Sequence, residues 1–198
     1  MEAGWDVVLV EPGPTGTRNA KRRGLQHIVC ATMQKAGFKP GSMSAVGVFD
    51  VVEHIEDDVK FVRHLHSLLK PGGMLYLAVP AYTFLWSDTD EYGGHFRRYS
   101  RQNLNFLCRA AGFKTEFITG IFMWLILPLL FYRAIPYRMA GKSTKNMADV
   151  DNIRRDHILP AWLKRFVKKW NGWEHSRISR AAPIPFGASF LLAAKKTA

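Results

Sequence analysis

The sequence predicts an α/β fold, in which a mostly parallel sheet is covered by helices on both faces. Short apolar runs that lack a helical period alternate with segments whose apolar residues recur at helical spacing. Proline, glycine or an acidic residue ends most of these runs, and such residues stop a strand. The hydrophobic share of 47% over 198 residues is typical of one globular domain and excludes a disordered chain.

The first half supplies the regular alternation. Residues 5–10 (WDVVLV) are rich in β-branched side chains and stop at the turn sequence EPGP, so they form the first expected strand. A short helix over 15–23 leads to a second strand over 26–32. Residues 45–52 (AVGVFDVV) form a third apolar strand. Residues 74–79 (MLYLAV) form a fourth, directly after a turn with the sequence PGG.

A helix over residues 55–69 connects the third and fourth strands. Val62 and Leu65 fall on one helical face, so this face is expected to pack on the sheet. Asp57 and Asp58 lie in the first turn, where acidic side chains suit the positive end of the helix dipole.

The second half is less regular. Residues 80–99 form a long polar and aromatic stretch, which is typical of a lid or binding loop. A helix is expected over 101–111 and a strand over 113–119. Residues 117–132 carry no charge, but these 16 residues fall short of the roughly 20 that span a bilayer. The chain closes with a helix and a strand, expected over residues 160–174 and 185–194.

Ligands of parallel α/β sheets bind where the strands end, at their carboxyl edge. The polar side chains to consider at that edge are Glu11, Thr32 and those of segments 50–54 and 79–82. We therefore expect the ends of four strands to build the site.

The net charge of +12 comes from the second half. Residues 1–100 hold 11 basic and 11 acidic side chains, whereas residues 101–198 hold 17 and 5. A neutral half followed by a basic half predicts a catalytic or binding core followed by a surface that meets anions. Phospholipid headgroups, a phosphorylated substrate and RNA are all such anions.

Two cysteines, Cys30 and Cys108, are too few for a disulfide framework, and both lie in apolar sequence contexts. The first six residues contain acids and no apolar run, unlike a secretory signal. These features predict two reduced, buried thiols in an intracellular protein, either cytoplasmic or peripheral at a membrane.

Four sequence blocks together resemble a known family. They are similar to class I S-adenosylmethionine-dependent methyltransferases. The four blocks are a strand ending in Glu11, a strand ending near Thr32, FDVVEHI and LLKPGGMLYLAVP. The resemblance covers residues 5–119 and returns in GASFLLAAKK. FDVVEHI together with GHFRRYS is similar to the branch of ubiquinone-pathway O-methyltransferases, small-RNA 3′-end methyltransferases and bacterial methyltransferases encoded beside glycosyltransferases.

The resemblance implies a Rossmann-like three-layer sandwich whose last strand runs antiparallel. It divides the chain into a methyltransferase core, residues 1–119 plus 185–198, and a helical, basic cap, residues 120–184. It places the family's first strand and glycine-rich cofactor turn upstream of Gly4, in the middle of the sheet. Because three residues precede Gly4, we expect an N-terminally truncated core with weak cofactor affinity, the alternative being a degenerate relative.

The resemblance also assigns a site for S-adenosylmethionine. Glu11 would accept two hydrogen bonds from the ribose diol, as carboxylates at strand ends do in dinucleotide sites, and the alternative is a solvated turn acid. Thr32 and Met33 stand where the family contacts the adenine. Asp50 and Val51 would lie beside the cofactor.

Asp50, Glu53, His54 and His95 resemble a metal-binding set of the related branch. Two carboxylates and two imidazoles suit Mg²⁺, Mn²⁺ or Zn²⁺. In the alternative without a metal, Asp50 lies near the cofactor, Glu53 caps a helix and His54 packs against its neighbours.

Methyl transfer is an in-line displacement at a sulfonium, so the enzyme mainly positions and desolvates its substrates. A hydroxyl acceptor also gains from a base, and His54 and His95 are the candidate catalytic residues because histidine titrates near neutral pH. The candidate substrate-binding residues lie in the long loop and are Tyr82, Trp86, Arg97, Arg98 and Tyr99. Arginines there would clamp a phosphate or carboxylate, and the alternative is a solvated basic turn.

The last expected helix is basic and amphipathic. One face carries tryptophan and other apolar residues, and the other carries Lys164, Arg165, Lys168 and Lys169. Such a helix is typical of a membrane-interfacial segment, and the alternative is a cap packed over the sheet. Nucleic-acid binding is a third interpretation, disfavoured because the tryptophans share a face suited to burial.

These observations predict a methyltransferase that acts on an oxygen of a lipid-linked, quinone-like or glycan substrate. A non-catalytic, membrane-associated scaffold of the same fold is the first alternative, and an RNA methyltransferase is the second. The expected partners are the small-molecule or lipid-linked substrate and an anionic membrane surface.

Overall fold

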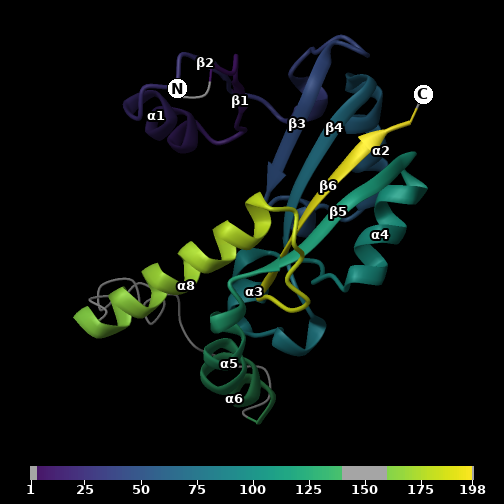
Figure 1. Cartoon of the computed structure of the whole chain (residues 1–198). Coiled ribbons are helices and arrows are strands. Elements are labelled where there is room, and N and C mark those ends of the chain that lie inside the picture. The colour runs from purple at the N-terminus through teal and green to yellow at the C-terminus, as the bar shows by residue number, and fades with distance from the viewer. Residues whose placement is uncertain (1–3, 140–159, 198) are drawn as a thin grey trace.

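The computed structural model describes residues 4–139 and 160–197, and its centre is a four-stranded main sheet (Figure 1). The strand order is β3 (Met43–Phe49), β4 (Leu69–Pro80), β6 (Ser189–Lys196) and β5 (Phe113–Ile121). β4 pairs in parallel with β3, and β6 runs antiparallel between β4 and β5. The predicted antiparallel last strand is therefore confirmed.

Two further strands form a separate sheet. β1 (Val8–Val10) pairs in parallel with β2 (His27–Val29), and α1 (Pro14–Arg22) connects them. In Figure 1 this unit stands beside β3 without joining the main sheet. The predicted α/β class is confirmed, but the sheet is split, because no strand of the described residues lies between β1 and β3.

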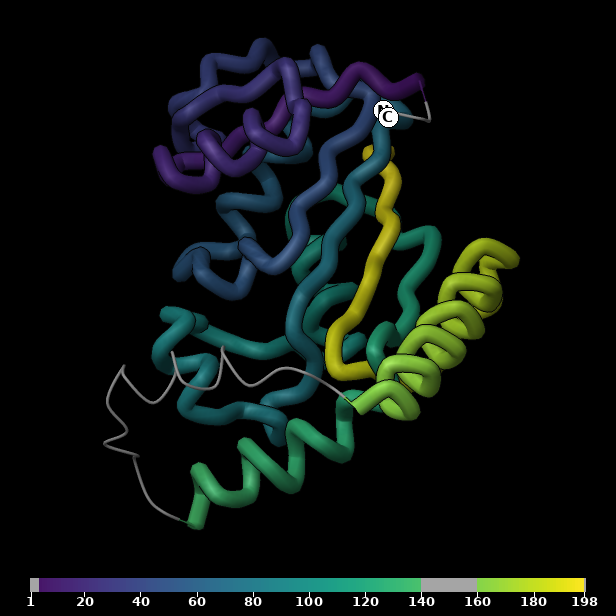
Figure 2. The backbone as a smooth tube through the Cα atoms, turned by 90° about the vertical axis from the view of Figure 1, so that its left-hand side faces the viewer, coloured from purple at the N-terminus to yellow at the C-terminus, as the bar shows by residue number. Residues whose placement is uncertain are grey.

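The core lies between the main sheet and two helices. α2 (Asp58–Leu68) and α4 (Arg101–Ala110) bury their apolar faces against alternate residues of β4 and β6. The fully buried side chains of this core include Leu65, Leu75, Leu77, Leu104, Phe190 and Leu192. Cys108 is buried in the same core, whereas Cys30 is exposed, so the prediction of two buried thiols is wrong for Cys30. α8 (Ala161–Ser179) lies on the opposite side of the sheet from α2 (Figure 2).

Most element boundaries differ from the prediction by a few residues: β3 ends at Phe49 and not at residue 52, and β6 begins at Ser189 and not at residue 185. α2 begins three residues later than expected, because the Asp57 carboxylate accepts a hydrogen bond from the Lys60 amide (2.9 Å) and caps the helix there. The preceding residues form a short 3₁₀ helix, η2 (Val52–His54). The predicted PGG turn belongs to β4, where it is accommodated as a bulge opposite the start of β3.

The loop and the cap contain several short helices. The predicted loop 80–99 holds η3 (Thr83–Leu85) and α3 (Asp88–Gly93). The chain after β5 is divided into η4 (Met123–Leu125), α5 (Ile126–Leu129), the π-helix η5 (Leu130–Ala134) and α6 (Ile135–Met139). Among the described helices, none has both the length and the apolar character needed to cross a bilayer. Part of the predicted cap, residues 140–159, lies outside the described residues.

Glu174 fastens α8 to the end of β5. Its side chain is 4% exposed and accepts hydrogen bonds from the backbone amides of Phe122 and Met123, each at 2.8 Å. A third hydrogen bond comes from the indole of Trp170 at 3.1 Å. A buried carboxylate that accepts three hydrogen bonds is well satisfied, so the contact holds α8 at a fixed place on the sheet.

We expect Glu174→Ala to lower the free energy of unfolding by about 2 kcal/mol, because two buried amides lose a charged acceptor. Hydrogen exchange read by mass spectrometry should speed up at residues 122 and 123 while β4 keeps its protection. Glu116→Ala is the control, since that residue forms only a surface ion pair with Lys114. Unchanged exchange at 122 and 123 would show that α8 docks by other contacts.

Candidate active site

The carboxyl edge of the main sheet carries a cluster of polar side chains. The chain leaves β3 through Asp50, which adopts a left-handed backbone conformation (φ 52°) while its amide bonds to the Ala78 carbonyl of β4. A non-glycine residue with positive φ is uncommon and is often found at functional sites. The turn leads directly into η2, which carries Glu53 and His54.

Glu53, His54 and His95 come together although His95 lies in a different loop. One donor atom of each lies within 4.8 Å of the others, and the two imidazole rings meet edge to face at 4.6 Å. The Phe96 amide donates to the Glu53 carbonyl at 2.8 Å, which ties the loop of His95 to η2. Asp50 was predicted as a fourth member but is not part of this close set.

Asp90 holds His95 in place. Its carboxylate accepts a hydrogen bond from His95 Nδ1 at 2.8 Å and is itself 1% exposed. A carboxylate only accepts, so His95 Nδ1 carries the proton and Nε2 is left as an acceptor.

Arg98 and Ser87 in turn hold Asp90. Arg98 donates to both carboxylate oxygens, at 2.7 Å and 3.0 Å, and the Ser87 amide adds a bond of 2.9 Å. Ser87 and Asp90 form the capping box at the start of α3. Arg98 also donates to the Ala81 carbonyl at 3.2 Å, which fixes the loop to the end of β4.

Burial sets the electrostatics of Glu53. Its side chain is 1% exposed, and the Oε2 atom has no hydrogen-bond partner within the described residues. Burial raises the pKa of Glu53 to about 7, with a further increase from the charge of Asp50. Burial also raises the pKa of Asp50, against the opposing influence of His95 and His54. A neutral acid, or a carboxylate beside a cation, is therefore expected at Glu53 near pH 7.

Arg97 and Tyr99 contact α2. Arg97 forms an ion pair with Asp58 at 2.8 Å and donates to the Glu56 carbonyl at 2.6 Å. The buried Tyr99 hydroxyl donates to Asp58 at 2.9 Å, and burial raises the pKa of this phenol. Arg97 and Tyr99, like Arg98, thus have partners within the protein, and the predicted role of all three in substrate binding stays a prediction.

The other predicted substrate residues follow β4. Tyr82 has a left-handed backbone (φ 57°), stacks on Phe84 at 5.0 Å and meets Phe190 edge to face at 5.2 Å. Trp86 follows η3 and is partly buried. Both residues lie on the same loop as His95, at the end of β4.

The predicted cofactor residues are divided between the two sheets. Glu11 follows β1 directly, and its carboxylate accepts a hydrogen bond from the Gly13 amide at 2.8 Å, at the start of α1. Gly16 lies so close that an added Cβ would sit 2.6 Å from the Glu11 side chain. Thr32 and Met33 follow β2, whereas Asp50 and Val51 follow β3. Their role in cofactor binding stays a prediction.

Two residues of the site were missed at the sequence level. Asp90 and Asp58 are the buried acids that organise the loop and the start of α2. The S-x-x-D pattern of Ser87 and Asp90 is a capping signal that would have placed α3, although it does not reveal the contact with His95.

The strand order, the antiparallel β6 and the polar cluster at the carboxyl edge define a Rossmann-like methyltransferase fold. Solved methyltransferase structures share it. One from Archaeoglobus fulgidus has 14% identity and a TM-score of 0.58 over 98% of this chain and 78% of its own. A putative methyltransferase from Bacillus halodurans has 15% identity and a TM-score of 0.56 over 97% of this chain and 83% of its own.

The sequence profile of the family described as "Methyltransferase domain" matches residues 1–116, and the chain belongs to this family. S-adenosylmethionine is the family's cofactor. A probable S-adenosylmethionine-dependent methyltransferase of Mycolicibacterium smegmatis is 34% identical over 83 residues, which is 41% of this chain and 32% of that protein. A ubiquinone biosynthesis O-methyltransferase of Xanthomonas campestris is 44% identical over 43 residues, 22% of this chain and 18% of that protein. The matches thus span a third or less of these curated relatives.

The raised pKa of Glu53 has a direct consequence for stability. The folded protein keeps this proton up to about pH 7, whereas the unfolded chain releases it near pH 4.5. Its stabilising effect is therefore complete below pH 4.5 and is lost as the pH rises through 7. With a chelator present, we compare the free energy of unfolding of Glu53→Gln with that of the wild type. We expect the difference to shift by about 3 kcal/mol in favour of Glu53→Gln as the pH rises from 4.5 to about 8.

Urea unfolding at several pH values measures this difference. Glu116→Gln is the matched control, because Glu116 is exposed on β5. Parallel stability profiles for the wild type and Glu53→Gln would show that Glu53 titrates as an ordinary carboxyl.

Proposed function

We propose that the protein is an S-adenosylmethionine-dependent methyltransferase that methylates a hydroxyl oxygen of a quinone-like, glycan or lipid-linked small molecule. The observation that carries the proposal is the Glu53–His54–His95 cluster at the carboxyl edge of the sheet, in a chain of the methyltransferase domain family. The similarity of the chain to part of a ubiquinone biosynthesis O-methyltransferase supports oxygen as the acceptor atom.

His95 is suited to the role of general base. In the reaction, the acceptor oxygen attacks the methyl carbon as the bond from carbon to the sulfonium breaks, which leaves S-adenosylhomocysteine. The hydroxyl proton has to go to a base, and His95 Nε2 is available because Asp90 engages Nδ1. The imidazolium that forms is stabilised by the buried Asp90 carboxylate. The residues thus orient the acceptor and take up one proton.

As an alternative to the base role of His95, the same cluster fits a divalent cation, which His95 would bind through Nε2. Two imidazoles and a carboxylate are a donor set for Zn²⁺ or Mn²⁺, and the Asp90–His95 contact is of the kind that orients a metal-binding histidine. The unpartnered, buried Oε2 of Glu53 supports this fit, because a buried carboxylate oxygen needs a partner. When bound, such a cation would lower the pKa of a coordinated hydroxyl.

Cofactor binding is tested by calorimetric titration with S-adenosylhomocysteine. We expect binding weaker than micromolar, because no strand that could carry the family's glycine-rich turn lies beside β1 and β3 among the described residues. Glu11→Ala should weaken it by about tenfold through loss of the ribose contact, and Glu116→Ala should not. Absence of binding by a folded chain would favour the non-catalytic scaffold, and equal affinity for Glu11→Ala would contradict the ribose role.

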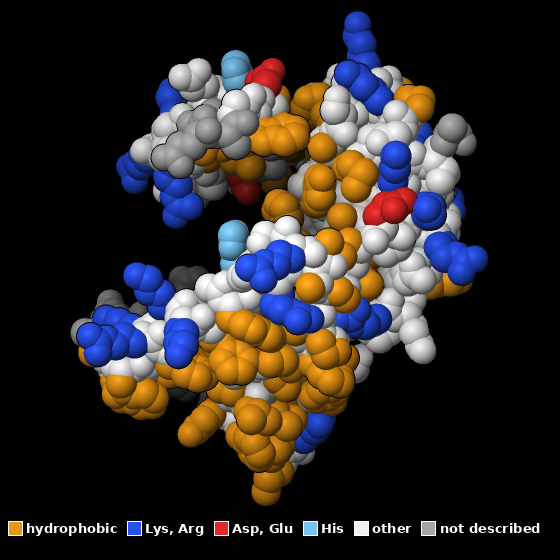
Figure 3. All heavy atoms as spheres, viewed as in Figure 1, with side chains coloured by type: hydrophobic (Ala, Val, Ile, Leu, Met, Phe, Trp, Pro, Cys, Tyr) orange, Lys and Arg blue, Asp and Glu red, His pale blue; other side chains and the backbone are white. Residues whose placement is uncertain are grey.

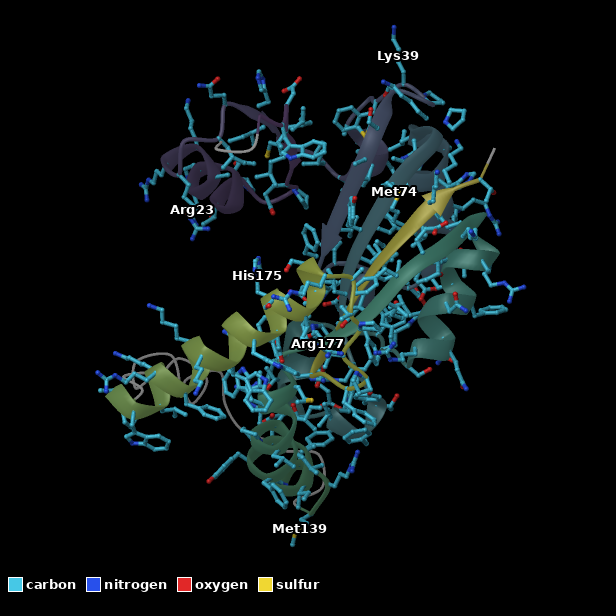
Figure 4. The ribbon with its side chains drawn as sticks, in the orientation of Figure 1. Arg23, Lys39, Met74, Met139, His175 and Arg177 are labelled. Carbon is cyan, nitrogen blue, oxygen red and sulfur yellow. The ribbon has the colours of Figure 1, made fainter. Side chains whose placement is uncertain are left out.

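The metal hypothesis is tested by thermal unfolding with Zn²⁺ or Mn²⁺. We expect either ion to raise the melting temperature of the wild type, because a ligand that binds only the folded state stabilises it. The shift should be lost in Glu53→Gln and His95→Gln and kept in His175→Gln, which lies on the exposed side of α8 (Figure 4). Equal shifts in all variants would place the ion elsewhere.

A further inference from the structure

The cap exposes a large apolar face beyond the sheet. Figure 3 shows hydrophobic side chains gathered over α5, α6 and the adjoining side of α8. Their exposed fractions are high for apolar side chains: 61% for Leu127, 59% for Phe131, 83% for Met139, 69% for Trp162 and 44% for Phe166. Met139 points away from the rest of the molecule (Figure 4). A contiguous apolar face of this kind marks an interaction surface.

The charged side chains of residues 117–139 and 160–173, which form this apolar face, are basic, while Glu91 of the neighbouring α3 accepts a hydrogen bond from Tyr137 of α6. Residues 117–139 and 160–173 contain no acidic side chain, and the acid that follows, Glu174, is used inside the molecule. Lys164, Arg165, Lys168 and Lys169 are exposed on α8, and none pairs with an acid of the described residues. In Figure 3 the basic side chains of α8 border the apolar side chains. The face therefore complements a surface whose outer layer is anionic and whose interior is apolar.

An apolar pocket connects this face with the end of β4. The cavity has a volume of about 580 Å³ and is lined by aromatic and aliphatic side chains. Leu127 and Phe166 belong both to the pocket and to the exposed face, whereas Tyr82 lines the pocket from the loop of the candidate active site. The Tyr82 amide donates to the Tyr99 carbonyl at 2.8 Å, next to Arg98. The pocket thus leads from the apolar face toward the loop that holds His95.

We propose that the apolar face docks on the surface of an anionic lipid bilayer. The tryptophans and leucines of α5 and α8 enter the headgroup–acyl boundary, and the lysines of α8 meet the lipid phosphates. This orientation turns the mouth of the pocket toward the hydrocarbon. Docking itself does not depend on the methyltransferase activity proposed above, although it would present a lipid-linked acceptor to that site.

Flotation of the full chain with vesicles tests the proposal, without cofactor or acceptor. We expect flotation with vesicles of equimolar phosphatidylglycerol and phosphatidylcholine, and much less with phosphatidylcholine alone. Leu127→Ser combined with Phe131→Ser should weaken binding by at least about tenfold, because two exposed apolar anchors are lost. Phe106→Ser is the matched control, since Phe106 is 70% exposed on α4, outside the face.

The charge contribution is tested by Lys168→Glu combined with Lys169→Glu. This variant should lose flotation with anionic vesicles while its unfolding curve stays unchanged. Lys60→Glu, which changes an exposed lysine of α2, is the control and should still float. Failure of the wild type to float would overturn the proposal. So would flotation unaffected by both double variants, or sedimentation in which the wild type is a dimer and the Leu127→Ser, Phe131→Ser double variant is a monomer. Single-stranded RNA that binds while vesicles do not would assign the basic surface to nucleic acid instead.

Discussion

The candidate active site depends on one buried ion pair, between Arg98 and Asp90. The two residues join α3, the His95 loop and the end of β4, because Asp90 also binds His95 and Ser87 while Arg98 binds the Ala81 carbonyl. Removal of one member of a buried pair leaves an unpaired charge and costs roughly 3 to 5 kcal/mol. The loop is therefore held in one conformation before any ligand arrives, and His95 stays beside Glu53 and His54.

Much of the fold is predictable from the local sequence. Apolar runs predicted the strands, whereas the antiparallel direction of β6 was implied by the family resemblance of the block GASFLLAAKK, and the pairing with β4 confirms it. The split of the sheet was harder to predict, because strand pairing depends on which edges are available and not on the strands' own composition. The PGG sequence in β4 shows a second limit of prediction from sequence. Glycine and proline indicate a turn, yet here the same residues form a bulge within a strand.

The site shows the same division between local and tertiary information. Glu53, His54 and His95 were candidates because of residue type and family resemblance, and the structure brings all three together. Asp90 was not recognised, because an acid in a polar loop has no sequence feature that reveals its burial. Arg98 and Tyr99 show the converse: their residue types indicated contacts with a ligand, but their contacts with Asp90 and Asp58 follow from tertiary packing.

The Glu174 contact also explains why the cap keeps its apolar face exposed. A helix with several tryptophans would bury most apolar area by lying flat on the sheet, and the hydrophobic effect alone favours that arrangement. Glu174 fixes only the carboxyl-terminal part of α8, where it binds the amides of Phe122 and Met123. The amino-terminal part then projects beyond the sheet with Trp162 exposed (Figure 1). Together with the hydrogen bond from the Trp124 indole to Asn171, the Glu174 contact holds α8 in its direction, and the exposed apolar face follows from that geometry.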